Sequence, residues 1–348
     1  MRRMTSMALR CFLLCMPLIF GACEHKDLCY DHEKHAPTCK AVVNADYVRQ
    51  WQHTMEGATD WRDEWPPIFG MEYDELLPAV PEGLRVLAYN SAQGHGLKNL
   101  PPGGGTVSLS EGPHSLLFYN NDTEYVVFNG LESFATASAT TRTRSRSSYL
   151  GNPYSGTDEE KTVNQPDMLF GNYRDGYEAR RTLKPDTLDV TMHPLVFTYL
   201  VRYEFTGGLE YVSLARGALA GMAGAVYLNS GRTSAETVTV LYDCTRQGSG
   251  VQAPVRSFGV PDYPNPDYTK AGVRKYALNL EVRLKNGKMK SFDFDITDQI
   301  EKQPRGGIIW VGGIEITEEE GTGGNAGFDV DVDDWGEYED IELPLVTG

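Results

Sequence analysis

Short runs of apolar residues, many of them alternating with polar ones, recur along most of the chain at spacings of roughly 8–15 residues. They are rich in β-branched and aromatic residues, and glycine, proline or asparagine separates them, which is typical of strands joined by turns. The longer helical periods of βαβ units are missing. We therefore predict an all-β protein, with strands at 84–90, 106–110, 115–119, 125–128, 188–192, 195–205, 237–242, 276–284, 290–296, 308–311 and 314–317.

Local turn chemistry predicts which of these runs are neighbours. Asn286-Gly287 lies between two alternating runs and predicts a β-hairpin. The turn Asn120-Asn121-Asp122 predicts a second hairpin, joining 115–119 to 125–128. The stretch 209–228 has the composition of an amphipathic helix, but its glycines disfavour a stable one.

The strand pattern falls into two series, which we interpret as two β-sandwich domains. The expected organisation is a signal peptide (1–22), a tether (23–44), an N-terminal sandwich (45–186) and a C-terminal sandwich (187–348). A short helix is expected over 45–56, and the Ser-, Thr- and Arg-rich stretch 132–165 is expected to be an exposed loop or loose strand pair.

The first 22 residues have the pattern of an export signal. Three arginines precede the apolar run 11–20, which is too short to span a bilayer but suits a secretory signal. Gly21-Ala22-Cys23 follows at once and looks like a bacterial lipobox, in which Cys23 becomes acylated and anchors the chain. The alternative is an ordinary signal peptide followed by a chance cysteine.

Charge excludes one class of function. The formal net charge is −16, and removing residues 1–22 with their three arginines leaves 29 basic against 48 acidic residues, a net charge of −19. Nucleic-acid binding needs a basic surface, so no nucleic-acid partner is expected. The excess is uneven, because the chain beyond Arg305 holds twelve acidic residues and no Lys or Arg.

No catalytic residue, cofactor or metal site is predicted. The chain lacks a G-x-S-x-G elbow, a P-loop and an H-E-x-x-H motif, so we expect no enzyme activity. The Cys and His residues over 25–39 match no common zinc module, and 329–334 lacks the Gly and Glu of an EF-hand loop. After removal of the signal and acylation of Cys23, three cysteines remain undecided; Cys29 and Cys39 are the local disulfide candidates, and Cys244 is the third.

An ordered set of segments then resembles a known family. After the lipobox come LRVLAYN (84–90), HSLLFYNNDTEYVVFNG (114–130), QPDMLFG (165–171), LARGALAGMAGAVYL (214–228) and GGNAGFDVDVDDWG (323–336). Together they resemble the fimbrillin-like surface lipoproteins of Bacteroidales, the superfamily of major and minor fimbrial subunits and their anchors. The resemblance implies two tandem transthyretin-like Greek-key sandwiches and an outer-membrane, lipid-anchored surface protein in pili.

The resemblance also implies assembly with other fimbrial subunits by strand exchange, which is a form of β-augmentation. Phe328, Val330, Val332 and Trp335 in the acidic C-terminal strand are the residues we expect to engage the partner. In stalk subunits of this family a trypsin-like protease removes the first strand after an Arg, and Arg49 and Arg62 are the weak options for that site here. Separately, the alternating Arg142, Arg144 and Arg146 mark a possible protease-sensitive loop. Read from the residues alone, that loop could instead bind an anionic glycan or form a solvated hairpin face.

The main function predicted is therefore a non-enzymatic outer-membrane lipoprotein that serves as a fimbrial anchor, accessory or structural subunit. The alternative is a glycan-binding surface lipoprotein, with Trp61, Trp65 and the many tyrosines as sugar platforms. In either case host glycans or proteins are candidate further partners.

Overall fold

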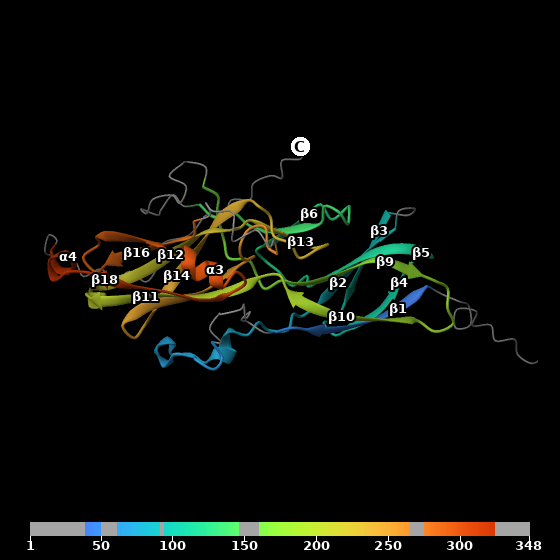
Figure 1. Ribbon diagram of the computed structural model, residues 1–348, viewed down its shortest axis with the longest axis horizontal. Helices are drawn as coiled ribbons and strands as arrows, with labels where there is room; N and C mark the ends of the chain where they lie inside the picture. The colour runs from blue at the N-terminus through green and yellow to red at the C-terminus, as the bar shows by residue number, and fades with distance from the viewer. Residues whose placement is uncertain (1–38, 50–60, 91–93, 146–159, 265–274, 324–348) are drawn as a thin grey trace, which may run out of the picture.

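The computed structural model describes residues 39–49, 61–90, 94–145, 160–264 and 275–323, and every structural statement below refers to these residues. The protein is all-β, as the alternating pattern predicted. Two large curved sheets lie end to end along the long axis of the molecule (Figure 1).

The first sheet has seven strands, and a small third sheet of three strands lies over one of its faces. In spatial order the first sheet contains β3 (Gly94–Leu100), β2 (Leu84–Asn90), β5 (Gly112–Tyr119), β9 (Phe170–Ala179), β10 (Asp186–Pro194), β1 (Lys40–Tyr47) and β4 (Gly104–Ser108). The small sheet contains β13 (Ala225–Tyr227), β7 (Ser138–Thr141) and β6 (Val126–Asn129).

The second sheet curls around the largest apolar core, which includes Tyr203, Leu219 and Val240. In spatial order it contains β17 (Met289–Asp295), β16 (Ala277–Leu284), β12 (Val212–Ala223), β14 (Thr237–Gln247), β15 (Gly250–Ser257), β11 (Phe197–Gly207) and β18 (Gly307–Glu315), with β8 (Thr162–Val163) beside β14. The short helical elements are η1 (Pro67–Phe69), η2 (Tyr73–Leu76), η3 (Leu209–Tyr211), α3 (Thr297–Lys302) and α4 (Glu318–Thr322).

The start of the described chain differs from the expected tether and helix. Residues 40–47 form β1, which pairs in parallel with β10 and antiparallel with β4. The tether expected over 23–44 therefore ends before residue 40, and residues 45–47 belong to a strand instead of the helix expected over 45–56. The physical reason is burial: Ala41 and Val43 are enclosed in the core of the first sheet.

The passage between the large sheets lies later than the expected boundary at 186/187. Strand β10 belongs to the first sheet and β11 to the second, so the chain crosses at residues 195–196. The two parts are also interleaved. The stretch 132–165, expected as an exposed loop or a loose strand pair, supplies β7 to the small sheet and β8 to the second sheet.

The hairpin expected around residues 120–122 does not form. Strand β5 pairs with β2 and β9, whereas β6 pairs with β7. Asn120 is buried, and its side chain donates to Met168 O and accepts from the backbone N–H of Phe170. Asp167 Oδ2 accepts the backbone N–H groups of residues 124–126. These bonds tie the connection to the segment before β9, so it leads into a different sheet.

The glycine-rich stretch 211–227 is mostly strand, and the helix that its glycines disfavoured does not form. A Cβ on Gly217 would lie 2.4–2.6 Å from the ring and hydroxyl atoms of Tyr242, so only glycine fits beneath that buried ring. Gly221 has a φ of 90° and lies where the pairing of β12 with β14 shifts register. The composition that looked helical therefore reflects close ring packing and a β-bulge.

An arm formed by residues 61–81 links the two large sheets. It lies between β1 and β2 in sequence, yet its apolar side chains pack on β11 and β18 of the second sheet. Phe69 is fully buried beside Leu200 and Ile308, and its carbonyl oxygen accepts a 2.7 Å hydrogen bond from Gln252 Nε2. The arm therefore covers one outer face of the second sheet.

Candidate functional site

The ends of the two large sheets are the places where a partner strand could add. Backbone N–H and C=O groups on an edge strand are free to pair with another chain unless something covers them. Among the described strands, β3 and β4 end the first sheet, and β17 and β18 end the second.

The edge of β18 is closed by two glutamine side chains. The Gln299 amide accepts the Trp310 N–H at 2.9 Å and donates to Trp310 O at 3.0 Å. The Gln303 amide makes the same two bonds with Ile308, both at 2.8 Å. Each side chain imitates one residue of a neighbouring strand, so backbone groups that a partner would use are already bonded.

The position of the Gln303 side chain is fixed by its surroundings. Trp61 Nε1 donates to Gln303 Oε1 at 3.0 Å, which ties the arm to this edge. Gly307 has a φ of 153°, and a Cβ there would lie 1.9 Å from Gln303 Oε1. A side chain at position 307 would therefore displace the glutamine from the strand.

Helix α4 lies beside the β16–β17 turn and the first residues of β17. Lys290 Nζ donates to both carboxylate oxygens of Glu320 at 2.8 Å and to Glu315 O at 3.0 Å. Thr317 and Glu320 form a capping box at the start of α4. The hydrogen bond from Lys290, together with the backbone N–H of Thr317, lowers the pKa of Glu320 from its usual 4.5 to about 2.

Acid is expected to break the ion pair between Lys290 and Glu320. The pKa of Glu320 is lower in the folded protein than in the unfolded chain, so this contact stabilises the fold above about pH 4.5 and is lost as the pH falls towards 2. The Lys290→Met variant should raise the midpoint of Glu320 titration towards 4.5, as measured by NMR. Glu319→Gln is the control, because it removes an exposed carboxylate of the same helix. An unchanged midpoint in Lys290→Met would contradict the assignment.

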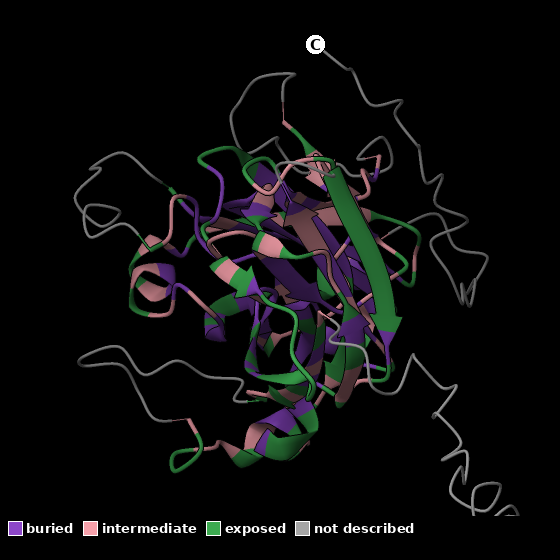
Figure 2. Cartoon of the chain, turned by 90° about the vertical axis from the view of Figure 1, so that its right-hand side faces the viewer, coloured by how far each residue is buried: buried purple, intermediate pink, exposed green. Residues whose placement is uncertain are grey.

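Strand β3 is the most open edge. Six of its seven residues are exposed, Leu97 is 52% exposed, and only Leu100 is buried. No atom lies within 4 Å of a Cβ built on Gly94 or Gly96. Figure 2 shows this strand as a long green arrow along one side of the molecule. Its backbone is therefore accessible for antiparallel or parallel strand addition.

Most of the residues predicted to act in assembly lie outside the described residues. This holds for Cys23, Phe328, Val330, Val332 and Trp335, and also for Cys29 and Arg146, so the lipid anchor, the partner strand and the disulfide stay predictions. Among the residues that the structure describes, no helix is long and apolar enough to cross a membrane.

Two arginines of the predicted protease-sensitive loop are described. Arg142 is half-buried, whereas Arg144 is only 8% exposed and is not in the exposed loop expected there. Arg144 Nη1 donates to Leu241 O at 3.3 Å, and Nη2 lies 3.6 Å from Asp243 Oδ2. These contacts hold residue 144 on the second sheet, so a protease could reach it only after that contact opens. Cleavage near Arg146 stays a prediction.

The two tryptophans considered as sugar platforms are parts of the arm. Trp65 packs against Phe69 and Tyr73, with ring centroids 4.9 and 5.8 Å apart, and its Nε1 donates to Met71 O at 2.6 Å. Trp61 holds the Gln303 side chain. Their contacts indicate a structural role.

The two edge glutamines were missed in the sequence. They are four residues apart, and a short helix therefore places them on one face, directly before the apolar run 308–311. That spacing was a usable signal. However, the spacing indicates an edge-closing role for the two glutamines only when the following strand is known to end a sheet.

The sequence matches one family model and is similar to a named fimbrial protein. The model of a family described as "Domain of unknown function (DUF5119)" matches residues 71–243. A protein of Bacteroides ovatus named "Putative fimbrium anchoring subunit Fim4B" is 24% identical over 306 residues, which cover 79% of this chain and 88% of that protein.

A solved structure shares this fold. A crystal structure of a "putative adhesin" from Bacteroides ovatus aligns with a TM-score of 0.55 at 21% identity, over 85% of this chain and 96% of that one. The fimbrial anchor protein Mfa2 from Porphyromonas gingivalis aligns at a TM-score of 0.40 and 12% identity, over 79% and 91% of the two chains.

By its fold the chain is an all-β protein with the architecture of that adhesin. Its sequence is similar to that of a protein named as a putative fimbrium anchoring subunit, and the predicted resemblance to the fimbrial proteins of Bacteroidales is confirmed.

Proposed function

We propose that this protein is a non-enzymatic fimbrial anchor, accessory or structural subunit at the cell surface, held in the outer membrane by acyl chains on Cys23. The observation that carries the proposal is the similarity over 79% of the chain to a protein named as a fimbrium anchoring subunit. The lipobox-like Gly21-Ala22-Cys23 supports the anchor. The large sheets would then be the two transthyretin-like units, meeting at residues 195–196.

In this proposal the protein joins neighbouring fimbrial subunits by strand addition. The exposed backbone of β3 supports this, because a partner strand there would find accessible hydrogen-bonding groups. The glutamine-closed edge of β18 would direct a partner away from the second sheet. The C-terminal segment around Phe328 to Trp335 would be the strand given to a neighbour.

The anchor is tested with a Cys23→Ala variant of the full-length protein, produced in its native host. We expect loss of labelled palmitate and loss of membrane retention. Cys29→Ala, six residues further on, is the matched control and should keep both. If Cys23→Ala stays acylated and membrane-bound, the proposed anchor is wrong.

Assembly is tested separately by deleting residues 328–348 and measuring recovery of fimbrial subunits with the protein. We expect that recovery to be lost while the membrane-bound amount is unchanged. Equal recovery of subunits with and without this segment would overturn its role as the partner strand.

A further inference from the structure

A pocket lies on the first sheet where the small third sheet stops covering it. Tyr89 on β2 is directly opposite His95 on β3 and Ser115 on β5, so these residues form one row across neighbouring strands. One step along, Leu87 and Leu117 are enclosed in the core beneath the small sheet. The loop 130–137 leans over the uncovered row and leaves a hollow of about 410 Å³.

The apolar part of this pocket is built from two fixed rings. Tyr89 and Phe134 meet edge to face, with centroids 5.9 Å apart. The Tyr89 hydroxyl donates to Leu131 O at 2.8 Å, which holds the ring against the loop. Burial, with smaller effects from Tyr119 and Glu132, raises the pKa of Tyr89 to about 12, so the ring stays neutral at physiological pH.

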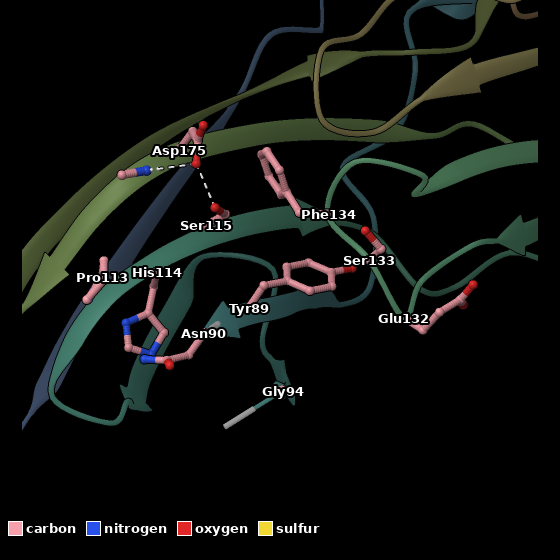
Figure 3. Close-up of a pocket in the computed structure, with 11 residues that line it drawn as sticks. Tyr89, Asn90, Gly94, Pro113, His114, Ser115, Glu132, Ser133, Phe134 and Asp175 are labelled. Carbon is pink, nitrogen blue, oxygen red and sulfur yellow. Dashed lines mark hydrogen bonds between the residues drawn. The ribbon is translucent and has the colours of Figure 1, made fainter. Parts of the chain in front are cut away.

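The polar part is a carboxylate held in one orientation. Asp175 Oδ1 accepts the Ser115 hydroxyl at 2.6 Å and the Gly176 N–H at 2.9 Å. Among the described residues Oδ2 makes no bond, so it can accept one from a ligand. Figure 3 shows the rings of Tyr89 and Phe134 beside this hydrogen-bonded pair.

The charge of the lining limits the class of ligand. Asp175 and Glu132 contribute two carboxylates, and the described lining contains no lysine or arginine. The ring nitrogens of His114 are bonded to Gly112 O and Ser110 Oγ, at 2.9 and 3.1 Å. An anionic ligand would therefore meet repulsion without a compensating cation.

We propose that this pocket binds a neutral sugar of one or two rings. The flat apolar side of a sugar ring packs on Tyr89 and Phe134, and sugar hydroxyls donate to Asp175 Oδ2 and to the Glu132 carboxylate. The volume lies near the lower end of the roughly 300–1,000 Å³ usual for small-molecule sites, which suits such a ligand. This inference does not depend on a role in fimbriae.

The test is a glycan array of neutral, uronic and sialylated sugars probed with the purified full chain, followed by titration calorimetry with the best neutral ligand. Asp175→Asn preserves side-chain size and should weaken binding about tenfold, because the hydrogen bond from the sugar to a charged Oδ2 is replaced by a weaker one to a neutral amide. Tyr89→Ala should abolish detectable binding, whereas Tyr89→Phe, which keeps the ring, should retain it. Tyr173→Ala is the matched control, because Tyr173 is a 45% exposed tyrosine of β9 outside this pocket.

Several results would overturn the proposal. One is the absence of binding to any neutral mono- or disaccharide at millimolar concentration. Another is binding that Asp175→Asn and Tyr89→Ala leave unchanged while both variants keep the wild-type melting temperature. Preferential binding of acidic sugars would contradict the charge argument. Tighter binding of a lysine- or arginine-containing peptide, lost in Asp175→Asn, would show that the pocket takes a basic side chain instead.

Discussion

Replacing Glu281 with glutamine is expected to destabilise the protein by about 3–5 kcal/mol, because it neutralises a buried carboxylate to which a buried guanidinium donates two hydrogen bonds. Glu281 and Arg216 lie opposite each other on β16 and β12, and their side chains are 0% and 1% exposed. Arg216 Nε and Nη2 donate to Glu281 Oε2 at 3.0 and 2.8 Å. Urea unfolding of the full chain measures the effect, as a lower midpoint with little change in slope.

The double variant Arg216→Met/Glu281→Leu is the control for this prediction. It removes both charges and replaces them with apolar side chains of similar size. Because a buried ion pair often contributes little net stability, this variant should unfold near the wild-type urea midpoint or above it. A single Glu281→Gln variant within about 1 kcal/mol of wild type would show that water or another group compensates the guanidinium.

Local patterns were sufficient for many of the strands and for one turn. The alternating run 84–90 coincides with β2, and Asn286-Gly287 joins β16 to β17 as predicted. In both cases the information is contained in neighbouring residues, as strand period and turn chemistry. The exposed strand β3 was missed because its sequence, GHGLKNL, has neither an apolar face nor β-branched residues.

Pairing between distant segments could not be read from such patterns. Strand β1 lies parallel to β10, although about 140 residues separate them, because both bury apolar side chains in the first core. The error at Asn120 has the same cause: its side chain bonds to residues 168 and 170 instead of closing a tight turn. A turn signal states that the chain bends, but tertiary contacts decide where it goes next.

The candidate interface was even less accessible to sequence reasoning. Whether a strand ends its sheet depends on the order of all the strands, and the glutamines that close β18 acquire their role only from that order. The C-terminal segment was identified by its acidic residues and by the family resemblance, whereas the exposed strand that could receive a partner has few charged residues and no such motif.

Removing the two edge glutamines is expected to open β18 to strand addition. The Gln299→Ala/Gln303→Ala variant loses four hydrogen bonds to the backbone of Ile308 and Trp310. Each contributes about 0.5–1.5 kcal/mol, and water replaces part of that, so we expect a stability loss of about 1–3 kcal/mol. The newly exposed edge should also pair with a second copy. Light scattering after size exclusion should show self-association that increases with protein concentration.

Lys302→Ala is the matched control, because it changes an exposed residue of the same helix without touching the edge bonds. The control should remain in the same oligomeric state as wild type over the same concentrations. Hydrogen exchange then tests whether the variant associates through the edge of β18 or through another surface. Hydrogen exchange should slow at the amides of residues 308 and 310 when the variant associates, since these groups would be paired again. A variant that loses stability but stays monomeric would show that the glutamines stabilise the fold locally and do not prevent strand addition at β18.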